Sequence, residues 1–370
     1  MSLPATPERG APCPDLREYG LPWLDALAET PQSPVWHGEG DVLIHTRMVA
    51  DELLRDERHQ ALDDEARAEL WLAALLHDVG KPATTRYENG HYRAPGHARR
   101  GAIMARRLLW EAGIEPAARE RICALVRHHM VPHHLIERVA PTRSCIEISL
   151  EAGAYRQYLL TRADALGRIA DDVDALATNV ELFAEYARDL GCLDAPYPFA
   201  SDHARFSYFR RDDRDPAYAA HDDTRSRVVV LSGLPGSGKD LWIARHGDGR
   251  PVVSLDDLRR ERGVKRGDKA GEGRLIQDAR ELARSYLRAS EPFIWNATNL
   301  SAQLRGQTLA LLADYHAHIT IVAVEAPADD LSRRNRDREH PVPWEAIERM
   351  LDRWEAPTVT ECHRLEVWSA

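Results

Sequence analysis

The sequence has few cysteines, and they are not arranged in pairs. Five cysteines occur among 370 residues, and no two of them form a C-x-x-C pair. A small odd set argues against both a disulfide framework and a zinc knuckle. Long apolar runs are also missing, since none reaches the roughly 18–20 residues that a membrane helix needs. The first residues lack the basic-then-apolar pattern of a secretory signal. We therefore expect a cytoplasmic protein with reduced thiols and no membrane association.

Lysine is scarce as well. Arginine supplies nearly all of the 49 basic residues, and the only lysines are Lys81, Lys239, Lys265 and Lys269. Arginine forks suit bidentate contacts with phosphate, although the base composition of a genome explains a general arginine bias more simply. The formal net charge of -10 excludes a general nucleic-acid coat and leaves room for a local basic groove.

The spacing of apolar residues divides the chain into two parts. Helical spacing from Asp41 to about Leu190, with no convincing strand, predicts an α-helical bundle after an irregular lead-in over 1–40. After Arg227, β-branched runs alternate with helical stretches, which predicts a parallel sheet covered by helices on both faces. The expected fold is therefore α + α/β. The expected parts are a helical domain over 1–195, a linker or packed extension over 196–226, and a second domain over 227–370.

Individual elements follow from the same patterns. In the first domain, helices are predicted over 42–54, 66–80, 97–113 and 118–129. In the second domain, strands are predicted over 227–233, 251–256, 292–298 and 318–326. The helices expected between and after these strands cover 239–246, 273–290, 301–317 and 343–354.

A glycine-rich loop connects the first predicted strand of the second domain to a helix. It reads GLPGSGKD and has the spacing G-x-x-x-x-G-K. The backbone N–H groups of such a loop, together with the helix N-terminus, bind phosphate. The residues predicted to hold the nucleotide are Gly233, Gly236, Ser237, Gly238 and Lys239. Asp240 stands where Ser or Thr usually helps to hold Mg²⁺, so it either binds the metal itself or alters metal use.

Polar residues follow the next two strands. A carboxylate beside a P-loop can accept a proton from an attacking hydroxyl, which makes Asp256 a candidate base and Arg259 a candidate phosphate ligand. A helix N-cap is an equally good explanation for Asp256. Asn296, Thr298 and Asn299 either line the same cleft or cap the following helix.

Four arginines stand close together near residue 335. They are Arg333, Arg334, Arg336 and Arg338. In a phosphoryl-transfer enzyme, a mobile arginine-rich lid neutralises charge on the transferred group. Arg334 and Arg338 are four residues apart and would share a helix face. A solvated basic helix face is the alternative, and the P-loop upstream favours the lid.

This half of the chain resembles the polynucleotide 5′-kinase branch of P-loop phosphotransferases over roughly 227–355. The resemblance rests on GLPGSGK, D-D-x-R, T-N-L and R-N-x-x-R. It implies that ATP or another NTP is used with Mg²⁺. It also implies that Asp256 is the general base on a polynucleotide 5′-OH, that Arg259 binds the acceptor's 3′ phosphate, and that Arg338 binds the donor.

Histidines and aspartates recur along the first domain in apolar surroundings. They are His45, His77, Asp78, His97, His128, His129 and Asp164. Imidazoles and carboxylates that converge inside a helical bundle are suited to a divalent transition metal. The alternative is a set of polar core residues, and it weakens because the residues come from separate helices.

This order of residues resembles the HD phosphohydrolase superfamily over roughly 41–170. The resemblance implies one metal held by His45, His77, Asp78 and Asp164. It implies a second metal at His97 and His129, with His128 as a rival because the adjacent pair leaves the register open. Lys81 would contact phosphate, or would act as a charge at a helix end. Mn, Fe, Co or Ni are the expected metals, since imidazole prefers softer ions than Mg²⁺.

The order of the two halves is similar to that of the bacterial HD-Pnk end-healing enzymes. This similarity implies a bifunctional enzyme of RNA or DNA repair. It would remove a 2′,3′-cyclic, 2′- or 3′-phosphate from one end and phosphorylate a 5′-OH on the other. The implied partners are RNA or DNA ends, an NTP and a separate ligase. The alternatives are an HD nucleotide phosphohydrolase fused to a kinase of nucleosides or metabolites, and a regulatory protein that only senses nucleotides.

Overall fold

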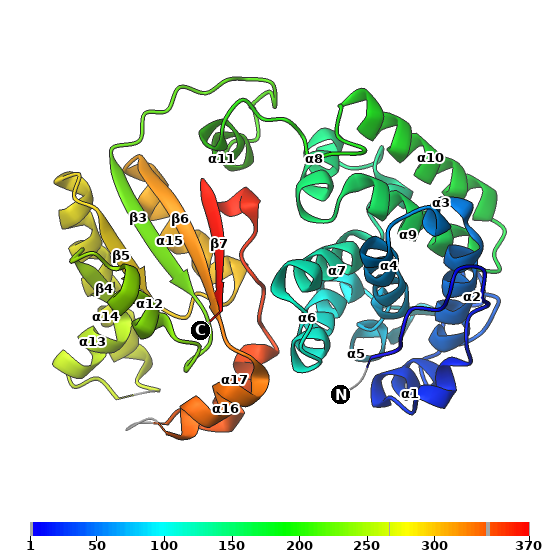
Figure 1. The fold of residues 1–370 in the computed structure, drawn as a ribbon, viewed down its shortest axis with the longest axis horizontal. Helices are drawn as coiled ribbons and strands as arrows, with labels where there is room; N and C mark the ends of the chain where they lie inside the picture. The colour runs from blue at the N-terminus through cyan, green and yellow to red at the C-terminus, as the bar shows by residue number, and fades with distance from the viewer. Residues whose placement is uncertain (1–2, 266, 338–340, 370) are drawn as a thin grey trace. The chain divides into compact units, whose positions relative to one another are not determined.

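The computed structural model describes residues 3–265, 267–337 and 341–369, and the chain folds as two compact units, Met1–Pro198 and Phe199–Ala370 (Figure 1). Residues 199–226 belong to the second unit. Within them, helix α11 (Asp202–Arg210) buries Phe206 in the hydrophobic core of that unit. The Arg205 guanidinium also donates to the His363 carbonyl at 2.7 Å.

The first unit is a bundle of helices. Its main helices are α2 (Val42–Arg55), α4 (Asp64–Leu76), α6 (His97–Glu111), α7 (Pro116–His128), α8 (Pro141–Glu151), α9 (Ala154–Leu166) and α10 (Val173–Asp189). Its short helices are η1 (Leu16–Tyr19), α1 (Pro22–Ala28), α3 (Glu57–Gln60), α5 (Lys81–Thr84) and η2 (Pro132–His134). The four helices predicted from the sequence are confirmed as α2, α4, α6 and α7. Asp41 and Asp63 begin α2 and α4, because each carboxylate accepts a hydrogen bond from a first-turn N–H group.

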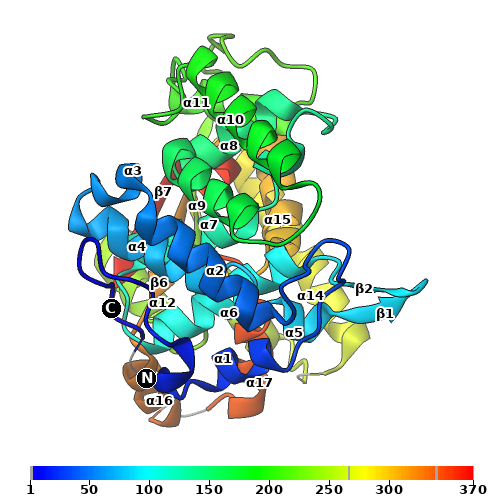
Figure 2. The same ribbon diagram turned by 90° about the vertical axis from the view of Figure 1, so that its right-hand side faces the viewer.

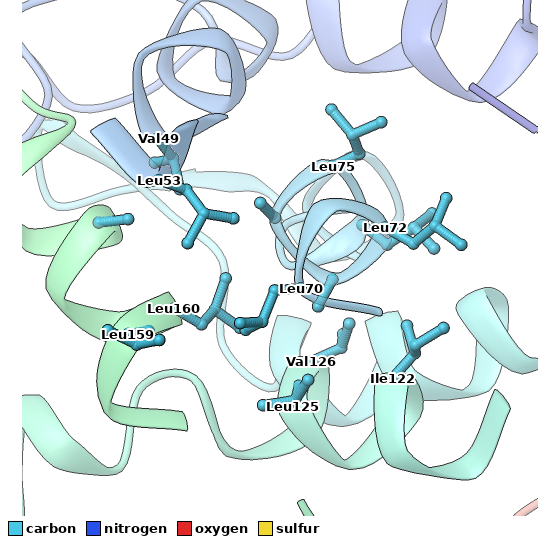
Figure 3. Packing of buried hydrophobic residues seen from close by; sticks show 14 of the residues in the cluster. Val49, Leu53, Leu70, Leu72, Leu75, Ile122, Leu125, Val126, Leu159 and Leu160 are labelled. Carbon is cyan, nitrogen blue, oxygen red and sulfur yellow. The ribbon is translucent and has the colours of Figure 1, made fainter. Parts of the chain in front are cut away.

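The core of this unit lies among α2, α4, α7 and α9. Figure 3 shows side chains from these four helices meeting, among them Leu53, Leu70, Leu125 and Leu160. All four are fully buried or nearly so. Apart from His97, which begins α6, the polar residues of the predicted metal site are carried by the same helices or lie at their ends, so this apolar packing fixes their positions.

The lead-in is more ordered than its composition predicts. Helix α1 lies within it and buries Trp23, Leu24 and Leu27 in the core. Pro22 occupies the first turn, where a missing N–H group costs no hydrogen bond and the fixed φ favours a helix. Proline therefore starts a helix here, whereas the sequence-based interpretation took it as a sign of irregular chain.

The first unit also contains a β-hairpin, so the prediction of no strand there is wrong. Strands β1 (Arg86–Glu88) and β2 (His91–Arg93) pair in antiparallel fashion, and Figure 2 shows them projecting from the helices. Asn89 and Gly90 connect them, with φ values of 52° and 84°. Two positive φ values in a two-residue connection are typical of a type I′ turn, for which Asn-Gly is the strongest sequence signal.

The second unit is built on a five-stranded sheet whose paired strands all run parallel. The strands are β3 (Ser226–Ser232), β4 (Val252–Ser254), β5 (Phe293–Asn296), β6 (Ala317–Glu325) and β7 (Arg364–Ser369), in the order β4-β5-β3-β6-β7. The remaining elements are α12 (Lys239–His246), α13 (Leu255–Glu261), α14 (Lys269–Arg288), α15 (Ala302–Asp314), α16 (Ala328–Arg336), α17 (Trp344–Leu351) and η3 (Val359–Glu361). The predicted parallel sheet with its helices is confirmed, and β7 is an additional edge strand that the sequence reading omitted.

The order of the strands determines where a ligand can bind. Strand β3 lies at the centre, and the chain leaves it first toward β5 and β4 and later toward β6 and β7. A crevice forms at the carboxyl edge of a sheet where the strand order reverses in this way. The glycine-rich loop follows β3 and so lies at that edge. Among the described residues, no helix combines the length and the apolar character needed to span a membrane.

Candidate active sites

The centre of the first unit is a buried group of histidine and aspartate side chains. It contains His45 of α2, His77 and Asp78 after α4, His97 at the start of α6, His129 after α7, and Asp164 of α9. All except His97 have at most 1% of their surface exposed. The six residues predicted as metal ligands are therefore brought together from five segments of the chain.

Asp78 lies in the middle of this group. Its Oδ2 atom is 3.2 Å from His77 Nε2 and 3.8 Å from His45 Nε2. Its Oδ1 atom is 3.4 Å from His97 Nε2 and 3.8 Å from His129 Nε2. The ligand atoms of His45, His77 and Asp78 lie within 4.8 Å of one another, and so do those of Asp78, His97 and His129. The arrangement is two ligand groups that share one carboxylate.

Backbone carbonyls orient these imidazole rings. The Gly167 carbonyl oxygen lies 3.0 Å from His45 Nδ1, and the other three rings share one pattern. The Nδ1 atoms of His77, His97 and His129 lie 2.7, 2.8 and 2.7 Å from the carbonyl oxygens of Ala74, Ala94 and Val126. In each case the carbonyl belongs to the residue three positions earlier. A carbonyl can only accept, so Nδ1 carries the proton and Nε2 presents its lone pair to the centre. This is the tautomer that a metal ligand needs.

Unsatisfied polar atoms test whether the group suits a metal. Within the described parts of the chain, buried His77 Nε2 and both carboxylate oxygens of Asp78 have no hydrogen bond of normal geometry, although the Lys81 ammonium lies 2.6 Å from Asp78 Oδ2. Buried polar atoms of this kind are rare without a partner. Imidazole nitrogens with carboxylate oxygens form a donor set for Mn, Fe, Co, Ni or Zn. The residues fit one or two divalent cations.

The structure also separates the two adjacent histidines. His129 faces Asp78, whereas His128 Nε2 lies 3.1 Å from the Glu151 carboxylate on α8. The imidazole of His128 therefore contacts Glu151 and not the cluster. Of the two adjacent histidines between which the sequence could not choose, His129 is the one that lies at the centre.

A matched pair of substitutions tests this assignment. We expect His129→Gln to lower metal content and hydrolytic activity by at least about tenfold, because a ligand nitrogen is lost. His128→Gln should leave both near the wild-type level, since a glutamine amide can still donate to Glu151. Metal analysis of the purified variants checks the prediction, and equal metal content in both would contradict it.

Asp164 has partners that the sequence did not identify. Its Oδ1 atom lies 3.1 Å from His45 Nε2, and its Oδ2 atom lies 2.9 Å from His133 Nε2. Arg168, just after the end of α9, donates to Oδ1 at 2.7 Å. His133 is fully buried, and its Nδ1 atom has no partner among the described residues. The signal that was overlooked is the second histidine pair, His133 and His134, shortly after the first.

Two further residues from the lead-in surround His45. Glu39 Oε1 lies 3.0 Å from His45 Nδ1 and 2.8 Å from His37 Nδ1, and the carboxylate is almost fully buried. Glu39 Oε2 accepts a hydrogen bond from the Ile169 N–H group at 2.9 Å. A carboxylate on the far nitrogen of a ligand histidine orients the ring and raises its basicity. Glu39 is thus a positioning residue for His45.

Burial and neighbouring charges set the protonation states of the group. Burial lowers the pKa of His129 to about 3, with help from the rings of His97 and His77. Burial would raise the pKa of Asp78, but Lys81 and the surrounding histidines outweigh it and hold the pKa well below its usual range. At His77, Asp78 outweighs the lowering effect of burial and raises the pKa, so a cation bound at this nitrogen would release a proton.

Lys81, the predicted phosphate contact, points into the same site. Its Nζ atom donates to Gln32 Oε1 at 2.7 Å, besides its contact with Asp78. Gln32 is itself held by a hydrogen bond of 3.2 Å to the Asp41 carbonyl. The ammonium is therefore held beside the cluster by Gln32 and Asp78. Its predicted contact with phosphate stays a prediction, as does the alternative of a charge at a helix end.

The glycine before Lys81 allows two segments to approach closely. A Cβ atom at Gly80 would lie 2.2 Å from the His97 carbonyl oxygen and 2.5 Å from the Gly101 nitrogen. We expect Gly80→Ala to destabilise the protein by about 2 kcal/mol, because the backbone of α6 cannot give way cheaply. Thermal unfolding checks this, with Gly306→Ala in α15 as control. A Cβ there meets nothing within 4 Å, so its stability should hold or rise.

A cavity of about 610 Å³ opens over the cluster. Its lining includes Asp78, His97, His129, Asp164 and Lys81. The rest of the wall includes residues of the lead-in and of the hairpin, namely Trp36, Arg86, Tyr92 and Arg93. Cavities of roughly 300–1,000 Å³ accommodate small organic ligands, so this one has room for more than inorganic phosphate.

In the second unit, the glycine-rich loop has the conformation of an anion cradle. Gly236 and Gly238 have φ values of 84° and 106°, which favour glycine. A Cβ atom at Gly233 would lie 2.2 Å from the Val324 carbonyl oxygen, so the loop closely approaches β6. The buried Ser237 hydroxyl has no hydrogen-bond partner in the described residues. These features fit a nucleotide phosphate chain.

Lys239 and Asp240 open helix α12 at this loop. The Lys239 ammonium donates to the carbonyls of Gly233 and Leu234, each at 2.9 Å, and so folds back over the loop. Asp240 Oδ1 accepts from the Asn296 side chain at 3.2 Å. The end of β5 therefore lies beside the P-loop. Asp240 and Asn296 form a polar pair near the place where Ser or Thr usually assists Mg²⁺.

The predicted base and its arginine lie on α13. Ser254 accepts the first-turn hydrogen bond from Asp257 N–H, so Ser254 is the N-cap and the capping explanation for Asp256 fails. Asp256 is largely exposed and pairs with Arg259, one helical turn later. Its carboxylate remains accessible to a substrate hydroxyl at the carboxyl edge of β4.

Thr298 and Asn299 have structural contacts. The Thr298 carbonyl accepts from Gly233 N–H at 2.9 Å, and the Asn299 amide donates to the Leu231 carbonyl at 2.7 Å. Asn299 is buried and has a positive φ of 48°. These two residues hold the start of the P-loop, whereas the Asn296 side chain contacts Asp240 beside it.

The arginine-rich segment forms the end of α16. Its described arginines are Arg333, Arg334 and Arg336, and Arg338 lies outside the described residues. A Cβ atom at Gly236 would lie 3.6 Å from the Leu331 carbonyl and 3.7 Å from the Asn335 nitrogen, so α16 packs on the P-loop. The Asn335 side chain pairs with both backbone groups of Val342, at 2.8 and 3.0 Å. Helix α16 therefore lies beside the predicted nucleotide site, where an arginine-rich lid would have to be.

Comparison with known families agrees with both sites. Residues 41–179 match the family described as the HD domain, and residues 228–357 match the family described as the AAA domain. The chain contains an HD domain and a P-loop domain. An HD domain implies a divalent metal and phosphohydrolase-type chemistry, and a P-loop domain of this kind implies an NTP with Mg²⁺ and kinase-type chemistry.

Curated relatives match only parts of the chain. A multifunctional CCA protein of Halorhodospira halophila is 38% identical over 117 residues, which are 32% of this chain and 26% of that protein. A CC-adding tRNA nucleotidyltransferase of Thermus thermophilus is 39% identical over 104 residues, 28% of this chain and 20% of that protein. The chain thus spans less than a third of the length of these two relatives.

Two solved structures match parts of the chain at low similarity. A chain of the Pnkp1/Rnl/Hen1 complex is 20% identical and has a TM-score of 0.28, covering 32% of this chain and 41% of that chain. A sugar kinase from Janibacter sp. HTCC2649 is 21% identical and has a TM-score of 0.31, covering 39% of this chain and 84% of that chain.

Proposed function

We propose that this chain heals broken nucleic-acid ends. In this proposal the HD domain hydrolyses 2′,3′-cyclic, 2′- or 3′-phosphate ends, and the P-loop domain transfers the γ-phosphate of an NTP to a polynucleotide 5′-OH. The observation that carries the proposal is that one chain holds two separate groups of residues suited to phosphate chemistry. One is the group centred on Asp78, and the other is the P-loop with Asp256 and Arg259 at the same sheet edge.

The residues of the HD domain divide the work of hydrolysis. His45, His77, Asp78 and Asp164 would hold one cation, and His97 and His129, with Asp78, the other. When bound, such cations supply Lewis acidity toward phosphoryl oxygens and make water a better nucleophile. The Lys81 ammonium, held by Gln32, would bind a phosphoryl oxygen of the ester. The surrounding apolar helices exclude bulk water and so strengthen each of these charge interactions.

The residues of the P-loop domain would carry out an in-line phosphoryl transfer. The Gly233–Lys239 backbone N–H groups and the Lys239 ammonium would cradle the NTP phosphates. Asp256 would accept the proton of the attacking 5′-OH, and Arg259 would bind the neighbouring phosphate of the strand. The arginines of α16 would neutralise charge on the transferred group.

Support for a strand as substrate comes from the D-D-x-R and R-N-x-x-R patterns and from the relatives. One relative is named as a CC-adding tRNA nucleotidyltransferase. RNA or DNA ends and an NTP are the proposed partners, and a separate ligase would join the healed ends. A reduced cytoplasmic setting is consistent with the burial of all five cysteines.

Two assays on the purified chain test the proposal. With NTP and Mg²⁺ it should label a 5′-OH oligonucleotide, and with Mn²⁺ or Ni²⁺ it should release phosphate from a strand with a 2′,3′-cyclic or 3′-phosphate end. A mononucleotide acceptor should compete poorly with the oligonucleotide in the first assay. Preferred use of the mononucleotide, or of a metabolite, would replace the proposal by a small-molecule kinase fused to a nucleotide phosphohydrolase.

A further inference from the structure

One wall of the HD cavity carries an aromatic side chain that hydrolysis of a phosphate ester does not require. Trp36 lines the cavity and keeps 39% of its surface exposed, so its indole lies where the cavity meets solvent. Its neighbour in sequence, His37, has its ring 4.7 Å from the ring of His45. Consecutive Cα atoms are about 3.8 Å apart, so Trp36 is only one residue from the edge of the metal-binding group.

The hairpin holds this indole in place. The ring of His91 lies 5.7 Å from the Trp36 ring at an interplanar angle of 50°, and the Arg93 guanidinium carbon lies 6.0 Å from its centroid. Both residues belong to β2. On the other side, the backbone N–H group of Trp36 donates to the Ser33 carbonyl at 3.1 Å and closes a turn. A tryptophan fixed by a backbone turn on one side and by a hairpin on the other is a preorganised flat surface.

The charges around the cavity are arranged in two zones. Near Asp78, the cations Lys81 and Arg168 are each paired with an aspartate of the cluster. Arg86 and Arg93 of the hairpin also line the cavity, together with Glu88, whose carboxylate lies 3.0 Å from Arg86 Nε. The inner zone suits the reacting phosphate, and the outer zone combines a flat aromatic ring with arginines. That combination is typical of proteins that bind single-stranded nucleic acid by base stacking and backbone contact.

We propose that Trp36, supported by hairpin β1–β2, stacks the terminal nucleobase of the strand whose phosphate end is hydrolysed at the Asp78 cluster. The inference rests on the proposed function of the HD domain and deepens it, since it specifies a base-bearing end as the substrate class. A cavity of about 610 Å³ can hold the terminal nucleotide together with its phosphate. Because every base has a flat face, the preference should vary little among the four bases.

The test compares two strands that differ in one base. Both carry a 3′-phosphate and a 5′-fluorescein block, and the terminal nucleotide of the second strand is abasic. For the base-bearing strand, Trp36→Ala should lower kcat/KM by about tenfold to a hundredfold. For the abasic strand, kcat/KM should stay unchanged. Trp36→Phe should restore most of the activity. Trp344→Ala should have no effect on either strand, because Trp344 is an equally exposed tryptophan of the second unit outside the cavity lining.

A binding measurement separates this inference from the proposed function. In EDTA, which stops turnover, fluorescence anisotropy should show that the full chain binds the base-bearing strand more tightly than the abasic one, and that Trp36→Ala removes this difference. If Trp36→Ala removes this difference in binding, but the wild type hydrolyses neither strand when metal is present, the stacking surface stands and the proposed hydrolysis fails. An equal loss on both strands, or no preference for the base in either assay, would overturn the stacking inference.

Discussion

Replacing Asp78 by alanine is expected to reduce release of phosphate from strand ends by at least about a thousandfold. The reason is geometric, because both ligand groups use this one carboxylate. Its loss therefore removes a ligand from each group at once, whereas His129→Gln affects only one of them. The substitution also leaves the buried Lys81 ammonium without its carboxylate partner. The 5′-kinase activity of the same preparation should stay near the wild-type level.

Single-turnover hydrolysis together with metal analysis measures this effect. Asp78→Asn serves as the companion variant, since it keeps the shape of the side chain and removes only the charge. Both variants should lose metal and hydrolysis together. Hydrolysis that persists in Asp78→Asn at the wild-type rate with Mn²⁺ would mean that the chemistry takes place away from this cluster.

Replacing Lys239 by alanine is expected to lower 5′-OH labelling by about a hundredfold to a thousandfold or more. In the structure its ammonium is satisfied by the carbonyls of Gly233 and Leu234. An incoming phosphate chain offers stronger, charge-assisted hydrogen bonds and would draw the ammonium away from them. Lys239→Arg should be nearly as damaging, because a planar fork does not replace a compact point charge.

The control for this experiment is another lysine of the same domain. Lys269→Ala removes an exposed charge at the start of α14 and should leave labelling unchanged. Phosphate release by Lys239→Ala should equal that of the wild type. Loss of both activities in Lys239→Ala would indicate that the two sites depend on each other, in conflict with the independent roles proposed for them.

Local sequence was enough to predict most of the fold. Apolar spacing located helices α2, α4, α6 and α7, and the β-branched runs located strands β3 to β6, because both signals depend on which face of an element is buried. The hairpin was missed although its Asn89-Gly90 turn is the usual signal, since the strands on either side are only three residues long. Strand β7 was missed because its exposed edge gives a weak apolar pattern.

The site shows a similar division. The order and spacing of the motifs predicted His45, Asp78 and the P-loop as site residues, because the residue types that the chemistry needs stand together in short stretches of sequence. His133 and Glu39 were missed, because their importance comes from contacts with residues 31 and six positions away in the sequence, which only the folded chain reveals. Spacing alone likewise could not tell whether Asp256 caps its helix. The Ser254 hydroxyl occupies the N-cap position in the folded chain, and the catalytic role of Asp256 stays a prediction.

The carbonyl contacts of His77, His97 and His129 have a consequence for how the protein acquires its metal. Each ring is aimed by its own backbone, three residues earlier, so its direction is set during folding and does not depend on an ion. A chelator should therefore yield a folded protein that regains activity when metal is returned. Such a site exchanges ions with its surroundings, and the ion it carries in a cell follows the local supply as much as the donor set.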